Sequence, residues 1–514
     1  MLTDGLKTAR IVTLMVLFLF ASELAATPSG ALKSPKKDAK WDVSAKFGPT
    51  KEIPIDVTEG TWMNVTVHPG GQKIAFDLLG DLYELPIQGG EARPLTQGPA
   101  WDMQPTYSPD GTSVAFTSDR AGGDNIWLMA AGGGKPRALT NERFRLYNSP
   151  AWSADSRYLV ARKHFTSRRS LGGGEIWMVH RDGGKGVQMT KRPNQQKDLG
   201  EPALSGSGRW LYYSRDATPG SVFQYNKDPN PGIFSIFRLD RKSGRTDKFI
   251  GGPGGAIRPT PSPDNHRIAY IRRVRGRSVL IARELKSGRE VVLTDQLDRD
   301  LQETWSIHGV YPSMAWTPDS QWVVYWAGGR LWRSSIHGAR KAIPFHVKST
   351  RRVHHALRSK VAVQPKEQRV RALRWPRFVY GSQAIVFEAL GRLWLQRKAS
   401  QKPVALTAPS NRRQFTPAPS PKAKQVAFAT WNDQEFGAIR VGALRPGAGS
   451  WPVTKEPGHY RAPAWSPDRK TIAFEKLKGG WLRSAAWSND PGIYVVSSRG
   501  GPMRRLTRKG FGPH

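Results

Sequence analysis

Short apolar runs alternate with polar turns along almost the whole chain, and one such phrase is repeated. Residues 102–116 read DMQPTYSPDGTSVAF, and residues 460–474 read YRAPAWSPDRKTIAF. In both, alternating apolar and polar positions lead into Ser-Pro-Asp, and a short apolar run follows. Alternation with a period of two predicts β-strands, and Ser-Pro-Asp-Gly predicts a tight turn between them. The pattern therefore predicts a β-hairpin that the chain uses more than once.

The hairpin phrase occurs in nine copies, the seventh of them degenerate. Its first six copies begin at residues 66, 106, 151, 203, 260 and 315, and the last three at 374, 418 and 464. A second phrase follows in several copies, as in DNIWLMAAGGGKPRALT (124–140), where an apolar strand leads through a Gly-rich turn to a short strand. Each unit is therefore expected to contain four short strands in a meander.

A repeated four-stranded unit of about 40–60 residues is typical of a β-propeller blade. The sequence thus predicts an all-β fold, a β-propeller of four-stranded antiparallel blades with about nine repeat units. Because propellers usually have about four to eight blades, nine units predict two propellers, or one closed propeller plus part of a second. Recurring tryptophans such as Trp152, Trp316 and Trp465 are expected in the core between blades.

The acidic residues of the hairpin turns are predicted to be structural. Aspartate stabilises tight turns by hydrogen-bonding its own backbone, and glycine adopts the left-handed conformation that ends the turn. The predicted structural turn residues are Asp110, Gly111, Asp264, Asp319 and Asp468.

The unusual feature of the composition is its net charge of +38, from 79 Lys plus Arg against 41 Asp plus Glu. Such a balance favours anionic partners, although a solvated basic exterior is the simpler interpretation. The densest basic segment lies at 339–372, and a possible polyanion or partner surface there contains Arg351, Arg352, His354, His355, Arg358 and Lys360. No basic recognition helix or aromatic RNA-binding motif occurs, so nucleic acid is disfavoured.

The N-terminus has the order of a secretory signal peptide. Lys7 and Arg10 precede the apolar run 11–21, and small residues follow up to an expected cleavage after Ala26. The chain has no cysteine, which excludes disulfides and a lipoprotein anchor. Together these features predict export to the periplasm, in a Gram-negative bacterium, with no membrane span after cleavage.

The motifs of common catalytic sites do not occur in the sequence, so we expect no catalytic, cofactor-binding or metal-binding residues. There is no Gly-x-Ser-x-Gly elbow, His-Glu-x-x-His motif, P-loop or EF-hand loop. Three interpretations stay open: a non-catalytic binding module, a propeller that works with a hydrolase, and a propeller enzyme with carboxylates in its channel. The third has no paired carboxylates at repeat-equivalent positions to support it.

The repeat resembles the TolB-type (WD40-like, PD40) propeller repeat. Its pattern of Pro-x-aromatic-Ser-Pro-Asp-Gly, Ile/Val-Ala-Phe, Ser-Asp-Arg, Ile-Trp and Leu-Thr is carried most completely by residues 104–140, and the resemblance covers roughly 59–507. The stretches at 40–111 and 311–333 are similar to exported bacterial proteins in which such a propeller precedes an amidohydrolase domain. That resemblance implies a protein partner or a linked metal-dependent hydrolase domain, and an alternative role as its regulatory or gating subunit. The metal-binding His-x-His motif of that domain is not present here.

The expected division of the chain follows from these patterns. Residues 1–26 are the signal peptide, 27–58 a linker or edge segment and 59–338 propeller units one to six. Residues 339–372 form a basic insertion or linker, and 373–514 contain further units, the last cut off in a tenth.

Overall fold

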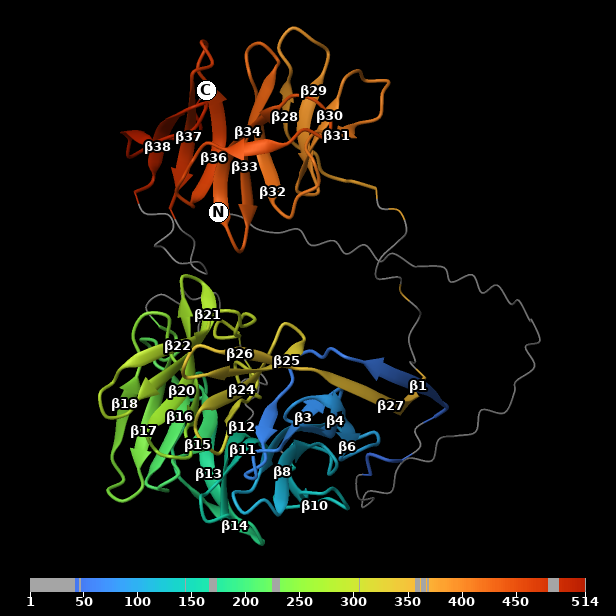
Figure 1. Cartoon of the computed structure of the whole chain (residues 1–514), viewed down its shortest axis with the longest axis vertical. Coiled ribbons are helices and arrows are strands. Elements are labelled where there is room, and N and C mark those ends of the chain that lie inside the picture. Colours follow the sequence, from blue (N-terminus) through green and yellow to red (C-terminus); the bar gives the residue numbers. More distant parts are fainter. Residues whose placement is uncertain are drawn as a thin grey trace, which may run out of the picture. The chain divides into compact units, whose positions relative to one another are not determined.

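The computed structural model describes residues 42–513 except 46–47, 144, 166–172, 224–231, 305, 356–360, 362–366, 368 and 479–489. Within these ranges all regular structure is β, in nine four-stranded sheets and one three-stranded sheet (Figure 1). The predicted all-β fold with four-stranded antiparallel units is confirmed. The predicted signal peptide, residues 1–26, lies outside the described residues.

The first six sheets are here called the six-sheet body. Each of them consists of strands from one continuous stretch of the sequence. Sheet 1 contains β2 (Val65–Val67), β3 (Lys73–Leu78), β4 (Asp81–Pro86) and β6 (Arg93–Pro94). Sheet 2 contains β7 (Asp102–Tyr107), β8 (Ser113–Ser118), β9 (Asn125–Ala130) and β10 (Arg137–Ala138). Sheet 3 contains β11 (Arg145–Trp152), β12 (Tyr158–Phe165), β13 (Gly174–His180) and β14 (Gly183–Gln188).

The other three sheets of this body follow the same order. Sheet 4 contains β15 (Leu199–Leu204), β16 (Trp210–Asp216), β17 (Phe234–Asp240) and β18 (Thr246–Ile250). Sheet 5 contains β19 (Ile257–Pro261), β20 (Arg267–Val274), β21 (Arg277–Glu284) and β22 (Glu290–Thr294). Sheet 6 contains β23 (Ala315–Trp316), β24 (Trp322–Ala327), β25 (Arg330–Ser335) and β26 (Arg340–Ile343).

The last three sheets are here called the three-sheet body. Sheet 7 contains β28 (Arg374–Phe378), β29 (Ile385–Ala389), β30 (Arg392–Gln396) and β31 (Val404–Ala405). Sheet 8 contains β32 (Arg413–Pro419), β33 (Gln425–Asn432), β34 (Phe436–Ala443) and β35 (Ser450–Pro452). Sheet 9 contains β36 (His459–Trp465), β37 (Thr471–Leu477), β38 (Gly492–Ser497) and β39 (Arg504–Thr507).

The hairpin turns have the local chemistry that the repeat predicts. In sheet 2, the Ser108 hydroxyl donates to Asp110 Oδ1 at 2.5 Å, and the same oxygen accepts the Thr112 N–H at 3.0 Å. Gly111 has φ 71°, and a Cβ there would lie 3.1 Å from His68 Nε2, so this position favours glycine. The Asp110 N–H in turn donates to Ser156 Oγ of sheet 3 at 2.9 Å. The turn residues therefore both close their own hairpin and bind the next sheet.

Consecutive sheets of the six-sheet body contact one another, and sheet 6 also contacts sheet 1. The Val65 N–H donates to Ser313 O at 3.2 Å, and the Trp326 indole donates to Gly60 O at 2.7 Å. Phe76 of sheet 1 and Val324 of sheet 6 belong to one buried apolar cluster. The series of inter-sheet contacts thus returns to its starting sheet.

The three-stranded sheet is not a propeller blade, and it is here called the clasp sheet. In it β27 (Phe345–His354) pairs antiparallel with β1 (Thr50–Val57) and parallel with β5 (Gly90–Glu91). Figure 1 shows β1 and β27 as a ribbon beside sheet 1. Residues 345–354, which the charge pattern placed in a basic linker, therefore connect the N-terminal strand to sheet 1.

Candidate functional site

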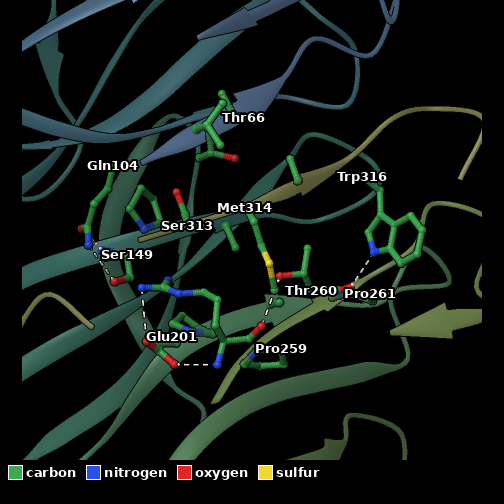
Figure 2. A pocket seen from close by; sticks show the side chains of 18 of the residues that line it. Thr66, Gln104, Ser149, Glu201, Pro259, Thr260, Pro261, Ser313, Met314 and Trp316 are labelled. Atoms are coloured by element: carbon green, nitrogen blue, oxygen red, sulfur yellow. Dashed lines mark hydrogen bonds and ion pairs between the residues drawn. The ribbon is translucent and has the colours of Figure 1, made fainter. Parts of the chain in front are cut away.

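The first strands of the six-sheet body face a common cavity. It has a volume of about 220 Å³ and is lined from all six sheets. Figure 2 shows side chains from these strands converging on it, with Thr66 from sheet 1, Gln104 from sheet 2, Ser149 from sheet 3 and Glu201 from sheet 4. Because its lining runs from Val65 to Trp316, the cavity exists only once all six sheets have assembled.

A repeated backbone feature turns polar side chains toward this cavity. Gln104, Ser149, Glu201 and Arg258 have φ values of 56°, 52°, 54° and 56°, and a proline follows each of them. The pairing register of the first strand shifts at each of these positions. Non-glycine residues rarely adopt the left-handed region, and such strained positions cluster at functional or structurally constrained sites. The bulge places the side chains of Gln104 and Glu201 between their own sheet and the next.

These side chains hydrogen-bond from sheet to sheet. The Ser149 N–H donates to Gln104 Oε1 at 2.7 Å, and the Arg258 N–H donates to Glu201 Oε2 at 2.8 Å (Figure 2). At the equivalent place between sheets 6 and 1, the Ser313 N–H donates to Asn64 Oδ1 at 2.8 Å. The polar ring, here defined as Asn64, Gln104, Ser149, Glu201, Arg258 and Ser313, thus links sheet 2 to sheet 3, sheet 4 to sheet 5 and sheet 6 to sheet 1.

Glu201 and Arg258 are the charged members of this ring. Arg258 Nη2 lies 3.2 Å from Glu201 Oε1, and both side chains are less than a tenth exposed. Burial lowers the pKa of the Arg258 guanidinium, while the Glu201 carboxylate opposes that change. The pair is therefore a compensated buried ion pair rather than a free charge.

The segment before sheet 6 crosses the cavity at the polar ring. His308 O accepts the Gln104 Nε2–H at 2.7 Å, and the Val310 N–H donates to Glu201 Oε1 at 2.8 Å. His308 Nε2 also lies 2.7 Å from Asp124 Oδ2. Because two of these contacts are to members of the polar ring, the segment closes the cavity on this side.

The other end opens at the Ser-Pro-Asp turns. A second hollow of about 390 Å³ lies there, and Trp316, Pro261 and Pro263 line both hollows. Its wall is largely apolar, with one residue or more from each of the six repeat units. The prolines and tryptophans that line it are Pro69, Pro109, Pro261, Pro263, Pro318, Trp152 and Trp316. The site is thus a pit with a polar closed end and an apolar open mouth.

Carboxylates stand around this mouth. Asp155 and Asp319 are exposed, and each accepts a side-chain hydroxyl through Oδ1 at 2.5 Å. The hydrogen bond from Ser108 holds the pKa of Asp110 well below its usual range, and Asp110 Oδ2 also lies 3.1 Å from Arg181 Nη1. The turns around the mouth therefore contain the exposed carboxylates of Asp155 and Asp319, whereas the carboxylate of Asp110 is paired with Arg181.

The turn residues selected from the sequence lie at these hairpins. Asp264 and Asp468 accept the hydroxyls of Ser262 and Ser466 at 2.5 and 2.6 Å, in the same way as Asp110. Of the five, Asp110, Gly111, Asp264 and Asp319 belong to the six-sheet body, and Asp468 belongs to sheet 9.

The structure describes four of the six basic residues selected from the sequence, and they differ in their surroundings. Arg351 binds Asp81 Oδ2 at 3.0 Å, Ala100 O at 3.1 Å and Leu79 O, so it anchors β27 to sheet 1. Arg352, His354 and His355 are exposed. Arg358 and Lys360 lie outside the described residues.

Sequence reasoning missed the polar ring. The available signal was a proline at the same place in successive units, namely Pro105, Pro150, Pro202 and Pro259. The side chain before each proline varies in type, so a search for repeated catalytic residues passes over it.

No group of three or more His, Asp or Glu residues placed to hold a metal ion occurs among the described residues. Nor does that part of the chain contain a helix of sufficient length and apolarity to cross a membrane.

Repeated four-stranded sheets whose first strands surround a common cavity define a β-propeller. Residues 63–215 match the family described as Tricorn protease N-terminal beta propeller domain. With this match and the nine sheets, the predicted TolB-like propeller fold is confirmed.

Three known proteins illustrate the similarity. Uncharacterized peptidase YuxL of Bacillus subtilis is 26% identical over 158 residues, which cover 25% of this chain and 24% of that protein. Tricorn protease homolog 1 of Streptomyces coelicolor is 25% identical over 272 residues, which cover 52% of this chain and 23% of that protein. The solved structure of putative TolB from Agrobacterium tumefaciens has a TM-score of 0.40 and 18% identity, over 58% of this chain and 91% of that one. The chain thus covers about a quarter of the length of each of these two curated relatives.

Proposed function

We propose that this protein is an exported, non-catalytic propeller that binds a segment of a partner protein in the pit of its six-sheet body. The observation that carries the proposal is the pit itself, which is closed at the polar ring and open at the Ser-Pro-Asp turns. Ligand sites in proteins are typically concave and mostly apolar, with a few polar groups that fix orientation.

The proposal includes a closed ring of six blades for residues 59–343. Its support is the set of hydrogen bonds between sheets 1 and 6 and the apolar cluster that contains residues of both. Under this proposal, sheets 7, 8 and 9 are blades that do not belong to the ring. The expected periplasmic location rests on the leader pattern of residues 1–26.

The shape and charge of the mouth favour a particular kind of segment. Proline and tryptophan edges provide apolar contact, which favours an apolar or aromatic side chain. The carboxylates of Asp155 and Asp319 favour a lysine or arginine next to it. The proposed ligand is therefore an extended peptide segment with an apolar residue flanked by basic ones.

The partner that we propose for this propeller is a hydrolase. YuxL is called a peptidase, and the tricorn homologue is called a protease, and each shares its similarity to this chain over only part of its own length. The sequence resemblance to propellers of amidohydrolases points to the same arrangement. The alternative function is thus a regulatory or gating subunit for a metal-dependent amidohydrolase or peptidase.

A matched pair of alanine-to-arginine variants tests the peptide proposal. Ala154 is exposed and lines the mouth, whereas Ala130 is exposed at the end of β9 and does not line either hollow. Immobilised chain is exposed to a defined library of eight-residue peptides, and the retained peptides are identified by mass spectrometry. The wild type and Ala130→Arg are expected to retain the same apolar-basic peptides, with Kd at least roughly tenfold weaker for Ala154→Arg, because a bulky cation enters the mouth.

Two results would contradict the proposal. Equal retention by Ala154→Arg and the wild type would remove the mouth as the binding site. No peptide retained by any of the three proteins would remove peptide binding as the function.

A further inference from the structure

The β3–β4 turn of sheet 1 and the β29–β30 turn of sheet 7 have the same backbone structure. The first turn is Leu79-Gly80 and the second is Leu390-Gly391. Both leucines are exposed and left-handed, with φ values of 52° and 55°. The carbonyl of each glycine accepts an N–H from the first strand of the following sheet at 2.9 Å. The two turns therefore occupy equivalent places in their blades.

The charges around these two turns are opposite. In sheet 1, Asp81 follows the turn and binds Arg351 of the clasp sheet, so an arginine from a distant strand covers this end of the sheet. In sheet 7, Arg392 has the position of Asp81, and Arg413 lies beside the turn glycine as Trp101 does in sheet 1. Neither Arg392 nor Arg413 forms an ion pair with another described residue. Because one backbone carries an acidic end in sheet 1 and a basic end in sheet 7, the fold itself does not require these arginines.

Arginines of sheet 7 and its surroundings line an open groove of about 850 Å³, here called the arginine groove. Each of the four is exposed and has no ion pair within the part of the chain that the structure describes, and they are Arg369, Arg371, Arg374 and Arg413. The carboxylates of Glu367 and Glu388 also line the groove, and Glu388 Oε1 accepts the Gly391 N–H at 2.6 Å. Four arginines against two glutamates leave the groove positively charged.

Exposed aliphatic side chains accompany these charges. Val370 and Leu390 line the groove and are 37% and 68% exposed, and Leu373 beside Arg374 is 59% exposed. All residues from 369 to 378 are exposed. Apolar groups gathered on a surface in this way are typical of an interaction site. Arginine suits such a site because its planar guanidinium binds a carboxylate through two hydrogen bonds.

We propose that the arginine groove binds an extended acidic segment of a partner protein. Carboxylates of the segment pair with the four arginines, and its apolar side chains contact Val370 and Leu390. The clasp sheet shows the same contact with the charges reversed, because there the basic strand β27 covers an acidic end of sheet 1. The groove belongs to the three-sheet body, so this inference does not rest on peptide binding by the pit.

The form of the groove favours a polypeptide over other anionic partners. A concave site of this size surrounds a segment of chain, whereas a membrane presents a flat surface. The lining contains aliphatic and no aromatic side chains, whereas single-stranded nucleic acid is bound by aromatic side chains that stack on its bases.

A peptide library and two charge-matched variants test the role of the arginines. Immobilised full chain is exposed to eight-residue peptides in which each acidic peptide has a counterpart with glutamine and asparagine in place of glutamate and aspartate. The wild type is expected to retain acidic peptides that contain leucine or valine, with Kd at least roughly tenfold weaker for the amide counterparts. Retention is expected to fall as the salt concentration rises, because salt screens exposed charges.

The groove variant combines Arg369→Gln, Arg371→Gln, Arg374→Gln and Arg413→Gln, and its Kd for the acidic peptides is expected to be at least roughly tenfold weaker than that of the wild type. The control variant combines Arg397→Gln, Arg445→Gln, Arg499→Gln and Arg504→Gln. These four arginines are exposed in the three-sheet body and do not line the groove. Because both variants lose the same charge, a difference between them is due to the place of the arginines and not to their number.

A pair of leucine variants tests the apolar contact separately. Asparagine tolerates the left-handed backbone, so Leu390→Asn and Leu79→Asn both leave their turns intact. Leu390→Asn is expected to weaken binding of the acidic peptides at least roughly threefold, because apolar area that the ligand covers is lost. Leu79→Asn, at the equivalent turn of sheet 1, is expected to bind them as the wild type does.

Three results would overturn the proposal. Equal retention of acidic peptides by the groove variant and the control variant would remove the groove as their site. Retention of no acidic peptide by the wild type would remove an acidic segment as the ligand. Binding of phosphatidylglycerol vesicles or of oligothymidine through the four arginines, without retention of acidic peptides, would assign the groove to a lipid surface or a nucleic acid instead. The apolar-basic peptides of the pit are read in the same library, so the two proposals fail independently.

Discussion

Gln104 illustrates how single residues connect the blades of this propeller. Its side chain is 4% exposed, accepts hydrogen bonds from the Ser149 N–H and the Thr117 hydroxyl, and donates to His308 O and Ser149 Oγ. One buried amide thus joins sheets 2 and 3 and the segment that closes the pit. A buried polar group without a partner costs about 1–3 kcal/mol, and loss of Gln104 leaves several such groups.

We therefore expect Gln104→Ala to lower the free energy of unfolding by about 2–4 kcal/mol. Urea unfolding followed by tryptophan fluorescence measures this change. Gln72→Ala is the matched control, because Gln72 is exposed, and its effect is expected to stay within about 0.5 kcal/mol. Similar small effects for both variants would mean that the polar ring does not hold the sheets together.

Arg351 shows that the charge of a residue does not by itself predict what its side chain contacts. The sequence 351–360 contains several basic residues and predicts a polyanion surface. The structure places the Arg351 side chain, only 13% exposed, against Asp81 and the carbonyls of Leu79 and Ala100. Sequence gives the number of charges, whereas the partner of this charge lies 270 residues away along the chain.

The clasp sheet is the element that brings the two ends of the six-sheet body together. His346 on β27 lies 2.5 Å from Asp56 Oδ1 on β1 and 2.7 Å from Glu91 Oε1 on β5. The hydrogen bonds to Asp56 and then Glu91 raise the pKa of His346 above its ordinary value. When protonated, its two ring nitrogens donate to both carboxylates and so connect all three strands.

The sign of the pH effect follows from the raised pKa of His346. The folded state holds the proton more tightly than the unfolded state, so this stabilisation is fully present below about pH 6.5 and is lost as the pH rises through the folded pKa. We expect His346→Gln to lower the urea midpoint of the six-sheet body more at about pH 6 than at about pH 8.5. His337→Gln, at an exposed position, is the control for the substitution itself. An equal effect of His346→Gln at both pH values would contradict the role of the protonated imidazole.

Local patterns predicted the blades but not the clasp sheet. Ser-Pro-Asp-Gly turns and alternating strands pair within one repeat unit, so the sequence contains their partners in order. β1 and β27 are far apart in the chain, and β27 carries lysine, arginine and histidine at positions where a buried strand would be apolar. Local patterns also did not predict the bulges at Gln104 and its equivalents, because a positive φ there depends on contacts with the neighbouring sheet.

At the scale of the whole molecule, the buried apolar clusters of the described residues divide the chain into two parts. Two clusters contain only residues between Val379 and Met503, counting their partly buried neighbours. The others contain only residues between Ile55 and Val347. Because cooperative unfolding follows shared burial, the six-sheet and three-sheet bodies are expected to unfold in separate transitions.

Differential scanning calorimetry with one core variant in each part tests this division. Phe116 belongs to a cluster of the six-sheet body and Phe474 to a cluster of the three-sheet body, and both are 0% exposed. Replacing a buried phenylalanine by alanine costs about 3–5 kcal/mol because it removes apolar contact and leaves a cavity. We expect Phe116→Ala to lower the Tm of one transition by roughly 5–15 °C and Phe474→Ala to lower the other by a similar amount. If either variant moved both transitions together, the two bodies would form one cooperative unit, and the division of the apolar clusters would not determine how the chain unfolds.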